Sequence, residues 1–293
     1  MDNNGHYKCQ ALLLRVSAKL PGGRFIKIFS PQIGVISCFE QKGKAAGSDN
    51  AFTSLKPYFL PDYSYVDLDL FSHRGKYYLS DFSVIYRFSL LTRSLPTLAA
   101  TSLILDLLTD LATDREQARK LWPYTLYALS AVDKPAENSV DLSVVRGIAA
   151  TYVLRALAES GYRPNLDLPS ATTAERTCFS FAAGSLQTYH QTEADSSLTS
   201  VQELSGNCTN LLRYICSCPV QRLYNIVISP ELSAYLWHFA ERWLAYNLEK
   251  EYSGQKSLDE LQKDSAAFLD LAAQIALKRR ERDQGAADKF VLK

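Results

Sequence analysis

The sequence predicts an α+β protein in two parts, a small β-barrel followed by an all-α helical domain, because the spacing of its apolar residues changes near Phe88. Before this residue, apolar and polar residues alternate with a period of two between turn residues, which is typical of short strands. After it, apolar residues recur at the spacing of an amphipathic helix. The 293 residues suffice for one large domain or two small ones. We therefore expect a barrel domain over residues 1–86 and a helical domain over residues 87–293.

Five short strands are expected within the first eighty residues or so. The fourth shows the pattern best, because Val66, Leu68 and Leu70 share one face and polar residues occupy the other. A turn at Gly75 joins it to the fifth, and a longer connection separates the third from the fourth. This arrangement fits a closed barrel of the oligonucleotide-binding (OB) type better than one half of an open sandwich. The expected strands cover residues 8–16, 24–29, 35–39, 65–70 and the segment from 76 onward.

The rest of the chain is expected to form a helical bundle. Pro96 is tolerated in the first turn of the first helix, Pro123 kinks or restarts the second, and Ser139 or Asp141 caps the third. The Leu and Ala residues that recur along these helices are assigned to the core. An irregular insertion is expected around 165–200, where no period is sustained. The expected helices cover 94–112, 114–122, 141–161, 204–218, 230–252 and 259–282.

Composition excludes several classes of protein. The 32 Lys and Arg residues balance the 31 Asp and Glu residues, which excludes a highly basic coat protein and an acidic disordered tail. No apolar run approaches the roughly 18–20 residues that cross a bilayer. The first residues, Met1 to Gly5, lack the basic start and the apolar stretch of a secretory signal. We therefore expect a cytoplasmic protein that does not bind membranes.

Six cysteines are too few and too irregularly spaced for a disulfide framework in a chain of this length. Cys216 and Cys218 form a C-x-C pair with Cys208 nearby, but a structural zinc site normally needs two C-x2-4-C knuckles. We expect buried thiols, and neither a metal nor another cofactor.

Charge is distributed unevenly along the chain. Residues 1–80 hold ten basic and six acidic residues, a net charge of +4, and the remaining residues carry −3. OB barrels bind single-stranded nucleic acid with a basic groove and with aromatic rings on which bases stack. Each ring could instead fill the core, and the loop lysines could be a solvated face. The candidate cations are Arg24, Lys27, Lys42, Lys44, Arg74 and Lys76, beside Phe25, Phe29, Tyr65, Tyr77 and Tyr78.

No pattern typical of catalysis is present. The histidines are scattered, and no nucleotide-binding loop, nucleophile elbow or zinc-protease motif occurs. We interpret His190 and His238 as structural. Asp67 and Asp69 share one face of a strand and could hold a metal or act as an acid and base, but exposed alternation explains them equally. We expect no catalytic residue.

The order of several segments resembles the bacterial recombination mediator RecO. That family opens with a strand, a basic strand ending in T-P-x-x-G-L-I, a K-G-x-R loop and an L-Q-P-F step. Each motif is degenerate, and their colinear order over nearly the whole chain carries the resemblance. The matching segments are Ala11–Arg15, Arg24–Ile36, Lys42–Lys44, Leu55–Tyr58, Tyr152–Arg155, Gly161–Pro164, Phe179–Gly184, Tyr246–Leu248 and Lys256–Leu258.

The resemblance implies an OB barrel followed by a helical domain, and a function in DNA repair. It implies binding of single- and double-stranded DNA, strand annealing, and loading of the recombinase RecA onto DNA that is coated with single-strand-binding protein. RecR and the C-terminal tail of the single-strand-binding protein are the implied direct partners, and Arg155 is the candidate for the pocket that takes this tail. The DNA-binding candidates are Arg24, Lys27, Lys42, Lys44, Lys56, Arg74 and Lys76.

The sequence departs from the family in one notable respect. Many members carry a four-cysteine zinc knuckle after the G-Y-x-P helix end, whereas the stretch Leu166–Thr172 holds no cysteine here. We therefore expect no zinc. The alternative function is a protein-interaction adaptor with weak or no DNA binding, because a net charge of +4 is modest for a DNA-binding barrel.

Overall fold

The structure is a computed structural model that describes residues 5–20, 22–41, 60–134, 141–167, 177–188, 201–261 and 263. Three of the expected DNA-binding lysines, Lys42, Lys44 and Lys56, lie outside these residues, as does most of the helix expected over 259–282.

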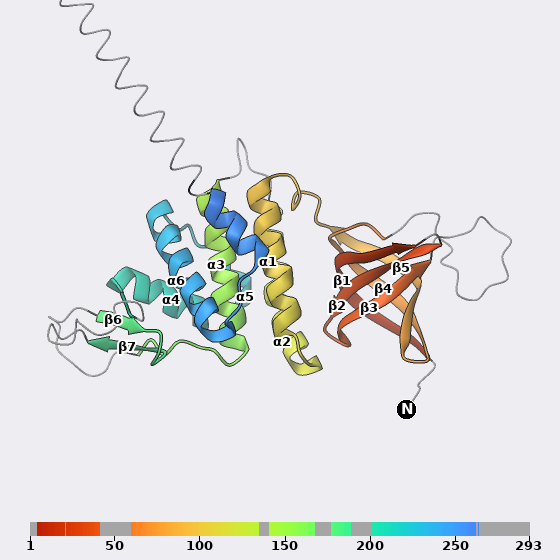
Figure 1. The fold of residues 1–293 in the computed structure, drawn as a ribbon, viewed down its shortest axis with the longest axis horizontal. Helices are drawn as coiled ribbons and strands as arrows, with labels where there is room; N and C mark the ends of the chain where they lie inside the picture. The colour runs from red at the N-terminus through yellow and green to blue at the C-terminus, as the bar shows by residue number, and fades with distance from the viewer. Residues whose placement is uncertain are drawn as a thin grey trace, which may run out of the picture.

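Five strands close into a barrel at one end of the molecule, which confirms the predicted OB-type topology (Figure 1). They lie in the order β1-β2-β3-β5-β4 around the barrel. Neighbouring strands are antiparallel except β3 and β5, which run parallel and so close the barrel. The strands are β1 (Gly5–Leu20), β2 (Gly23–Ser30), β3 (Gly34–Gln41), β4 (Ser64–His73) and β5 (Lys76–Arg87).

The period of two decides which side chains fill the barrel. Val66, Leu68 and Leu70 of β4 point inward and are buried, as predicted, and they meet Ile26 and Ile28 of β2 there. Side chains at the intervening positions face outward, where they either contact the helices or remain open to solvent. A barrel residue can therefore act as a binding residue only where it alternates with the buried positions of its strand, so that its side chain faces outward. We call this odd or even position its parity along the strand.

The helical part begins after a short connection from β5. Ser94 caps α1 through a reciprocal pair of bonds with Thr97, and Asp114 caps α2 by accepting from the backbone N–H of Gln117 at 2.8 Å. α2 runs on through Pro123 as one helix, where the sequence predicted a kink or restart. The helices are α1 (Leu95–Leu111), α2 (Arg115–Val132), α3 (Leu142–Glu159), α4 (Gly206–Ser217), α5 (Val220–Leu223) and α6 (Pro230–Leu248), followed by a helical segment over 253–261.

A small sheet corrects the expectation of an all-α second part. β6 (Thr177–Ser180), β7 (Ser185–Thr188) and β8 (Val201–Glu203) form a three-stranded sheet in the order β7-β6-β8. Phe179 of β6 is fully buried and packs its ring 5.0 Å from Phe239 of α6. Strands of three or four residues are too short to show a period of two, so the sequence indicated only an irregular insertion here.

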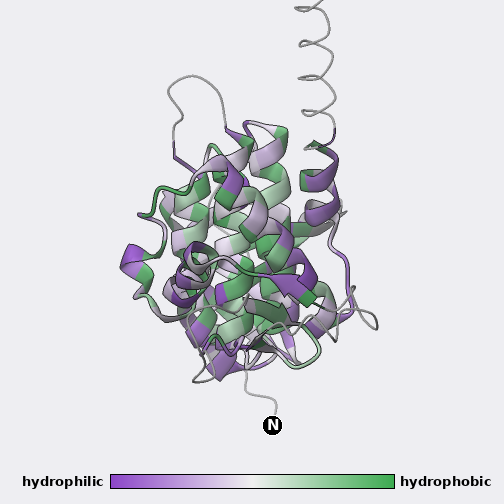
Figure 2. Ribbon diagram, turned by 90° about the vertical axis from the view of Figure 1, so that its left-hand side faces the viewer, coloured by the Kyte–Doolittle hydropathy of each residue, from purple (hydrophilic) through white to green (hydrophobic). Residues whose placement is uncertain are grey.

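The outer face of β1 and β2 joins the core of the bundle, while the barrel interior forms a second core of its own. Leu12 and Phe29 face outward from β1 and β2 and pack with the helices. The indole of Trp122 on α2 lies 5.4 Å from the ring of Phe29 and 5.6 Å from that of Tyr65. Figure 1 shows α2 on the side of the bundle that faces the barrel. Figure 2 shows the helical end, with apolar segments along the central helices and hydrophilic segments toward the outside.

Among the described residues, none of the helices combines the length and the apolar character that crossing a membrane requires.

Candidate nucleic-acid interface

One row of rings crosses the outer face of the barrel. The backbone register pairs Phe25 of β2 with Phe39 of β3, and Phe39 with Tyr78 of β5. It pairs Tyr78 with Phe71 of β4, and Phe71 with His6 of β1. Because cross-strand partners share a face, all five rings lie on the outside. We call these five residues the aromatic row.

Three neighbouring pairs of rings in the aromatic row contact each other at steep angles rather than in parallel stacks. The centroids of Phe25 and Phe39 lie 5.1 Å apart at 60°, those of Phe39 and Tyr78 lie 6.4 Å apart at 76°, and those of His6 and Phe71 lie 5.2 Å apart at 56°. Phe25 is 38% exposed, an unusual fraction for a phenylalanine in a strand. Tilted rings that stay partly open present π-faces to which flat ligands can stack.

Two cations lie at the hairpin beside the aromatic row. Arg74 and Gly75 connect β4 to β5 with φ values of 49° and 73°, as the two central residues of a type I′ turn require. Arg74 and Lys76 are exposed, and Lys76 pairs across the hairpin with His73. Tyr78 follows Lys76 on the same face of β5, so the hairpin brings both cations close to the middle of the row, where Phe71 and Tyr78 lie.

Arg24 lies elsewhere than expected, because it is buried inside the barrel end. Its Nε donates to Glu40 Oε2 at 2.6 Å, and its guanidinium also donates to the carbonyl of Leu60. The side chain of Glu40 is 1% exposed and accepts from the backbone N–H of Leu60. Parity explains this placement, since Arg24 shares a face of β2 with Ile26 rather than with Phe25. The guanidinium is held by the protein itself and does not face an outer groove.

Lys27 lies on the outer face of the barrel, but toward the bundle. It pairs across the strands with Arg15 of β1 and is half-buried. Burial lowers the pKa of the Lys27 ammonium group and the neighbouring charge of Arg15 lowers it further, while Asp110 and Asp106 of α1 oppose this. Lys27 therefore belongs to the junction with the helices, two residues along β2 from the aromatic row.

The other aromatic candidates divide between core and surface. Phe29 and Tyr65 pack against Trp122, and Tyr77 packs against the barrel interior, so these three are structural. Phe25 and Tyr78 belong to the aromatic row. The sequence missed the remaining members, since the row depends on which strands are neighbours and on their register.

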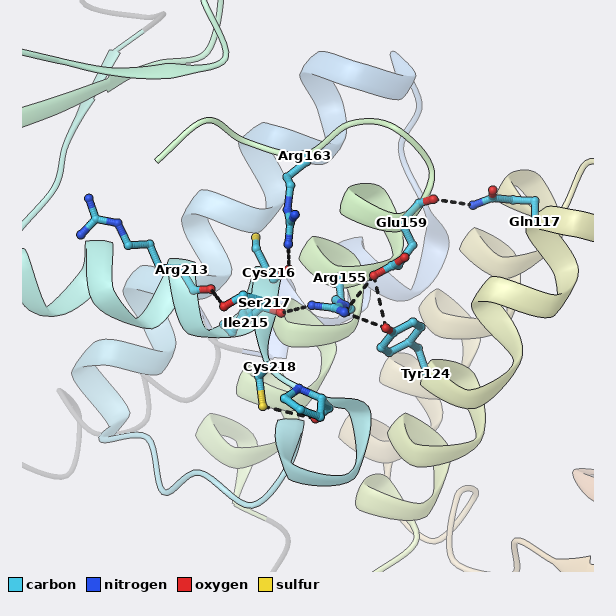
Figure 3. Close-up of polar contacts among 11 residues, drawn as sticks. Gln117, Tyr124, Arg155, Glu159, Arg163, Arg213, Ile215, Cys216, Ser217 and Cys218 are labelled. Atoms are coloured by element: carbon cyan, nitrogen blue, oxygen red, sulfur yellow. Dashed lines mark hydrogen bonds and ion pairs between the residues drawn. The ribbon is translucent and has the colours of Figure 1, made fainter. Parts of the chain in front are cut away.

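Arg155 lies inside the bundle rather than in an open pocket (Figure 3). Its side chain joins three helices: it pairs with Glu159 of α3 at 2.9 Å, donates to the hydroxyl of Tyr124 on α2 at 2.6 Å, and donates to the carbonyl of Ile215 on α4 at 3.1 Å. Its guanidinium also lies 4.7 Å from the centre of the Tyr124 ring. Its charge, its two terminal nitrogens and the face of its guanidinium have partners within the protein, while its buried Nε has no hydrogen-bond partner among the described residues, so these contacts tie Arg155 into the bundle.

The bundle has an apolar cavity that the sequence did not indicate. It has a volume of about 370 Å³ and lies between α1, the end of α2, α3 and the segment 223–228. Its charged lining residues are Arg93, Lys134 and Asp141. Val227 at its edge is 98% exposed. Apolar lining residues include Val132, Val145, Ile148 and Ile226.

Thiols and carboxylates do not assemble a metal centre in the part of the chain that the structure describes. All six cysteines are buried and unpaired as disulfides. Burial raises the pKa of Cys38 to about 12 and that of Cys216 to about 11, so these thiols stay protonated. Asp67 is exposed on β4, and Asp69 accepts from Nδ1 of His6 at 3.1 Å.

Fold and site together define a barrel-and-bundle protein whose barrel presents aromatic rings and hairpin cations on its outer face. The family model described as "Recombination protein O C terminal" matches residues 93–256, more than half of the chain. The chain therefore belongs to the RecO family of recombination mediators, which act in DNA repair and are not known as enzymes. A search of curated proteins found no match. Its partners are, in general terms, DNA and other recombination proteins.

Proposed function

We propose that this chain is a recombination mediator that binds single-stranded DNA across the aromatic row. In the same role it binds double-stranded DNA, anneals strands, and helps to load RecA onto DNA coated with single-strand-binding protein, with RecR as a partner. The observation that carries the proposal is the row of outward rings, with two hairpin cations beside its middle, on an OB-type barrel in a RecO-family chain.

The row matches the way in which such barrels hold single strands. Bases stack on aromatic rings, each contributing about 1–3 kcal/mol, while cations contact the backbone phosphates. Because the row runs across the strands, we place the DNA path perpendicular to them. Phe25 and His6 lie at the two ends of this path, and Arg74 and Lys76 lie beside its middle, near Tyr78. Lys42, Lys44 and Lys56 remain candidates for further phosphate contacts.

The cavity in the bundle supports a second contact, with the acidic tail of the single-strand-binding protein. We place this contact at the cavity rather than at Arg155, whose guanidinium is committed to Glu159 and Tyr124. An apolar pocket accepts an apolar side chain, and Arg93 and Lys134 on its lining favour acidic neighbours.

Titration of a fluorescent oligonucleotide of about 30 nucleotides tests DNA binding, followed by anisotropy at low and moderate salt. The variant Arg74→Glu/Lys76→Glu should weaken binding about tenfold or more. It should also reduce the slope of log affinity against log salt by about 1.4, because each phosphate contact on a single strand contributes about 0.7. The matched control Arg222→Glu/Lys256→Glu reverses two exposed charges of the bundle and should change affinity less than twofold. Absence of binding by the unmodified protein at low salt would favour the adaptor function instead.

A labelled peptide with acidic residues and an apolar residue at its carboxyl end tests the cavity. Val227→Asp places a negative charge at the edge of the cavity and should weaken peptide binding about tenfold. Ile85→Asp, which changes an exposed apolar residue of β5 in the same way, is the control and should bind as the unmodified protein does. Equal binding by both variants would remove the cavity from the proposal.

A further inference from the structure

The interior of the bundle holds two polar atoms that no described residue satisfies. The Nε of Arg155 and the hydroxyl of Tyr224 are both buried, and neither forms a hydrogen bond within the described part of the chain. The other nitrogens of this guanidinium are occupied, one by Ile215 and one by Tyr124 and Glu159 (Figure 3). A buried polar group without a partner costs free energy, and in folded proteins an ordered water molecule is a usual partner for such a group.

The two atoms belong to one polar cluster. Tyr224 directly follows α5, while Arg155 and Tyr152 come from neighbouring turns of α3. Burial raises the pKa of the Tyr224 phenol well above its ordinary value, and the charge of Tyr152 raises it further. The charge of Arg155 lowers this pKa, and that of Tyr124 raises it. The guanidinium is therefore close enough to the phenol for its charge to act on it.

Tyr152 supplies an acceptor to the same cluster. The Oγ1 of Thr125 donates to the carbonyl of Leu121 at 3.0 Å, so in the 3.1 Å bond between Thr125 and Tyr152 the phenol is the donor. The oxygen of Tyr152 can still accept a hydrogen bond. The Nε of Arg155 can only donate, and the hydroxyl of Tyr224 can do both. The three groups therefore match a ligand that both accepts and donates hydrogen bonds.

Charge decides which ligand fits. Arg155 pairs with Glu159 at 2.9 Å, so the cluster is close to neutral, and an anion would bring an uncompensated charge into the interior. A water molecule is neutral, donates and accepts, and makes about three hydrogen bonds at buried sites. The cavity of about 370 Å³ borders the cluster, because Tyr224 also lines this cavity.

We propose that a single buried water molecule joins the Nε of Arg155 to the hydroxyls of Tyr224 and Tyr152, and that it positions Tyr224 in the wall of the cavity. The water site is independent of what the barrel binds. Its effect on the cavity rests on the proposed function, in which the cavity takes an acidic peptide. Tyr224 is then a positioning residue, because its hydroxyl acts through the water rather than on the peptide.

Thermal unfolding of the full-length Tyr224→Phe variant tests the water by the sign of the change. With the water in place, the variant loses one hydrogen bond and should melt about 2–4 °C below the unmodified protein. A hydroxyl that nothing bonds would instead be an unpaired buried group, whose removal leaves Tm unchanged or raises it, and either result would overturn the proposal. Tyr127→Phe, at an exposed position of α2, is the control and should change Tm by less than about 1 °C.

A high-resolution crystal structure of the unmodified protein tests the site directly. It should show a water oxygen about 2.7–3.2 Å from the Nε of Arg155 and within hydrogen-bond distance of both hydroxyls. A site without water, or a protein atom bonded to this Nε, would overturn the proposal.

Binding of the labelled acidic peptide tests the effect on the cavity. Tyr224→Phe should weaken this binding about three- to fivefold, which corresponds to one hydrogen bond, whereas Tyr127→Phe should bind as the unmodified protein does. Equal binding by Tyr224→Phe would overturn the positioning role. If the unmodified protein does not bind the peptide, the proposed function of the cavity fails, and the Tm and the crystal structure still decide the water site.

Discussion

Replacing Arg24 tests whether this cation stabilises the barrel rather than holding DNA. Arg24→Ala removes the partner of Glu40, whose side chain is 1% exposed, and leaves that carboxylate with the backbone N–H of Leu60. It also removes the donor to the Leu60 carbonyl. Removing one partner of a buried ion pair costs about 3–5 kcal/mol, because the remaining charge is uncompensated. For a chain of this size, this corresponds to a decrease in Tm of about 10 °C.

Urea unfolding, followed by tryptophan fluorescence, measures the effect. Trp122 contacts Phe29 and Tyr65 of the barrel, so its emission reports on separation of the barrel from the bundle. Arg24→Met/Glu40→Gln should recover about 2 kcal/mol relative to Arg24→Met alone, because the buried charge disappears while Leu60 N–H keeps an acceptor. Lys76→Ala, at an exposed position, should change stability by no more than about 0.5 kcal/mol. Arg24→Ala protein with unchanged stability but lost DNA affinity would refute the reasoning.

Two further predictions concern the helical segment 253–261. Glu241 of α6 is half-buried close to Asp259, and burial, followed by a hydrogen bond to Asp259 and repulsion from its charge, raises the pKa of Glu241 to about 8. The folded protein thus holds a proton that the unfolded chain releases near pH 4.5, so the free energy of unfolding should fall as the pH rises from about 5 to about 8. Glu241→Gln should make the urea midpoint depend less on pH over this range. A Cβ at Gly254 would lie 2.3 Å from the carbonyl oxygen of Ala99 on α1, so Gly254→Ala should destabilise the protein by about 1–3 kcal/mol in the same assay. Gly206→Ala adds a Cβ in open space and serves as the control; equal stability of the two variants would contradict the close approach to α1.

The fold was largely predictable, because each element is coded locally. Alternation places Val66, Leu68 and Leu70 inside the barrel, and caps at Ser94 and Asp114 mark where helices begin. The end of α6 was placed too late, since Glu249 leaves the helix in a left-handed conformation that its residue type does not favour. The sheet of β6, β7 and β8 was missed because it is held by the burial of Phe179, a tertiary effect.

The candidate site was only partly predictable. The parity of β2 could have placed Arg24 inward, since Ile26 and Ile28 mark the buried face of that strand. The aromatic row could not be read in this way, because Phe39 and Phe71 belong to strands separated by a long connection whose register the sequence does not encode. The cavity requires the packing of α1, α3 and the segment 223–228, which are far apart in the chain.

The inward placement of Arg24 changes how the barrel must bind DNA. With Arg24 paired to Glu40, and Lys27 half-buried at the junction with α1, the cations of the hairpin beside the aromatic row are Arg74 and Lys76, and exposed Lys8 lies two residues along β1 from His6. Two phosphate contacts on a single strand give a salt slope of only about −1.4, so stacking on the rings must supply most of the affinity. A steeper measured slope would mean that cations other than Arg74 and Lys76 also contact phosphates. Lys42, Lys44 and Lys56, which lie between β3 and β4 in the chain, are the first residues to replace in that case. The ratio of stacking to charge is therefore measurable, and it separates a mediator that holds bases from one that holds only the backbone.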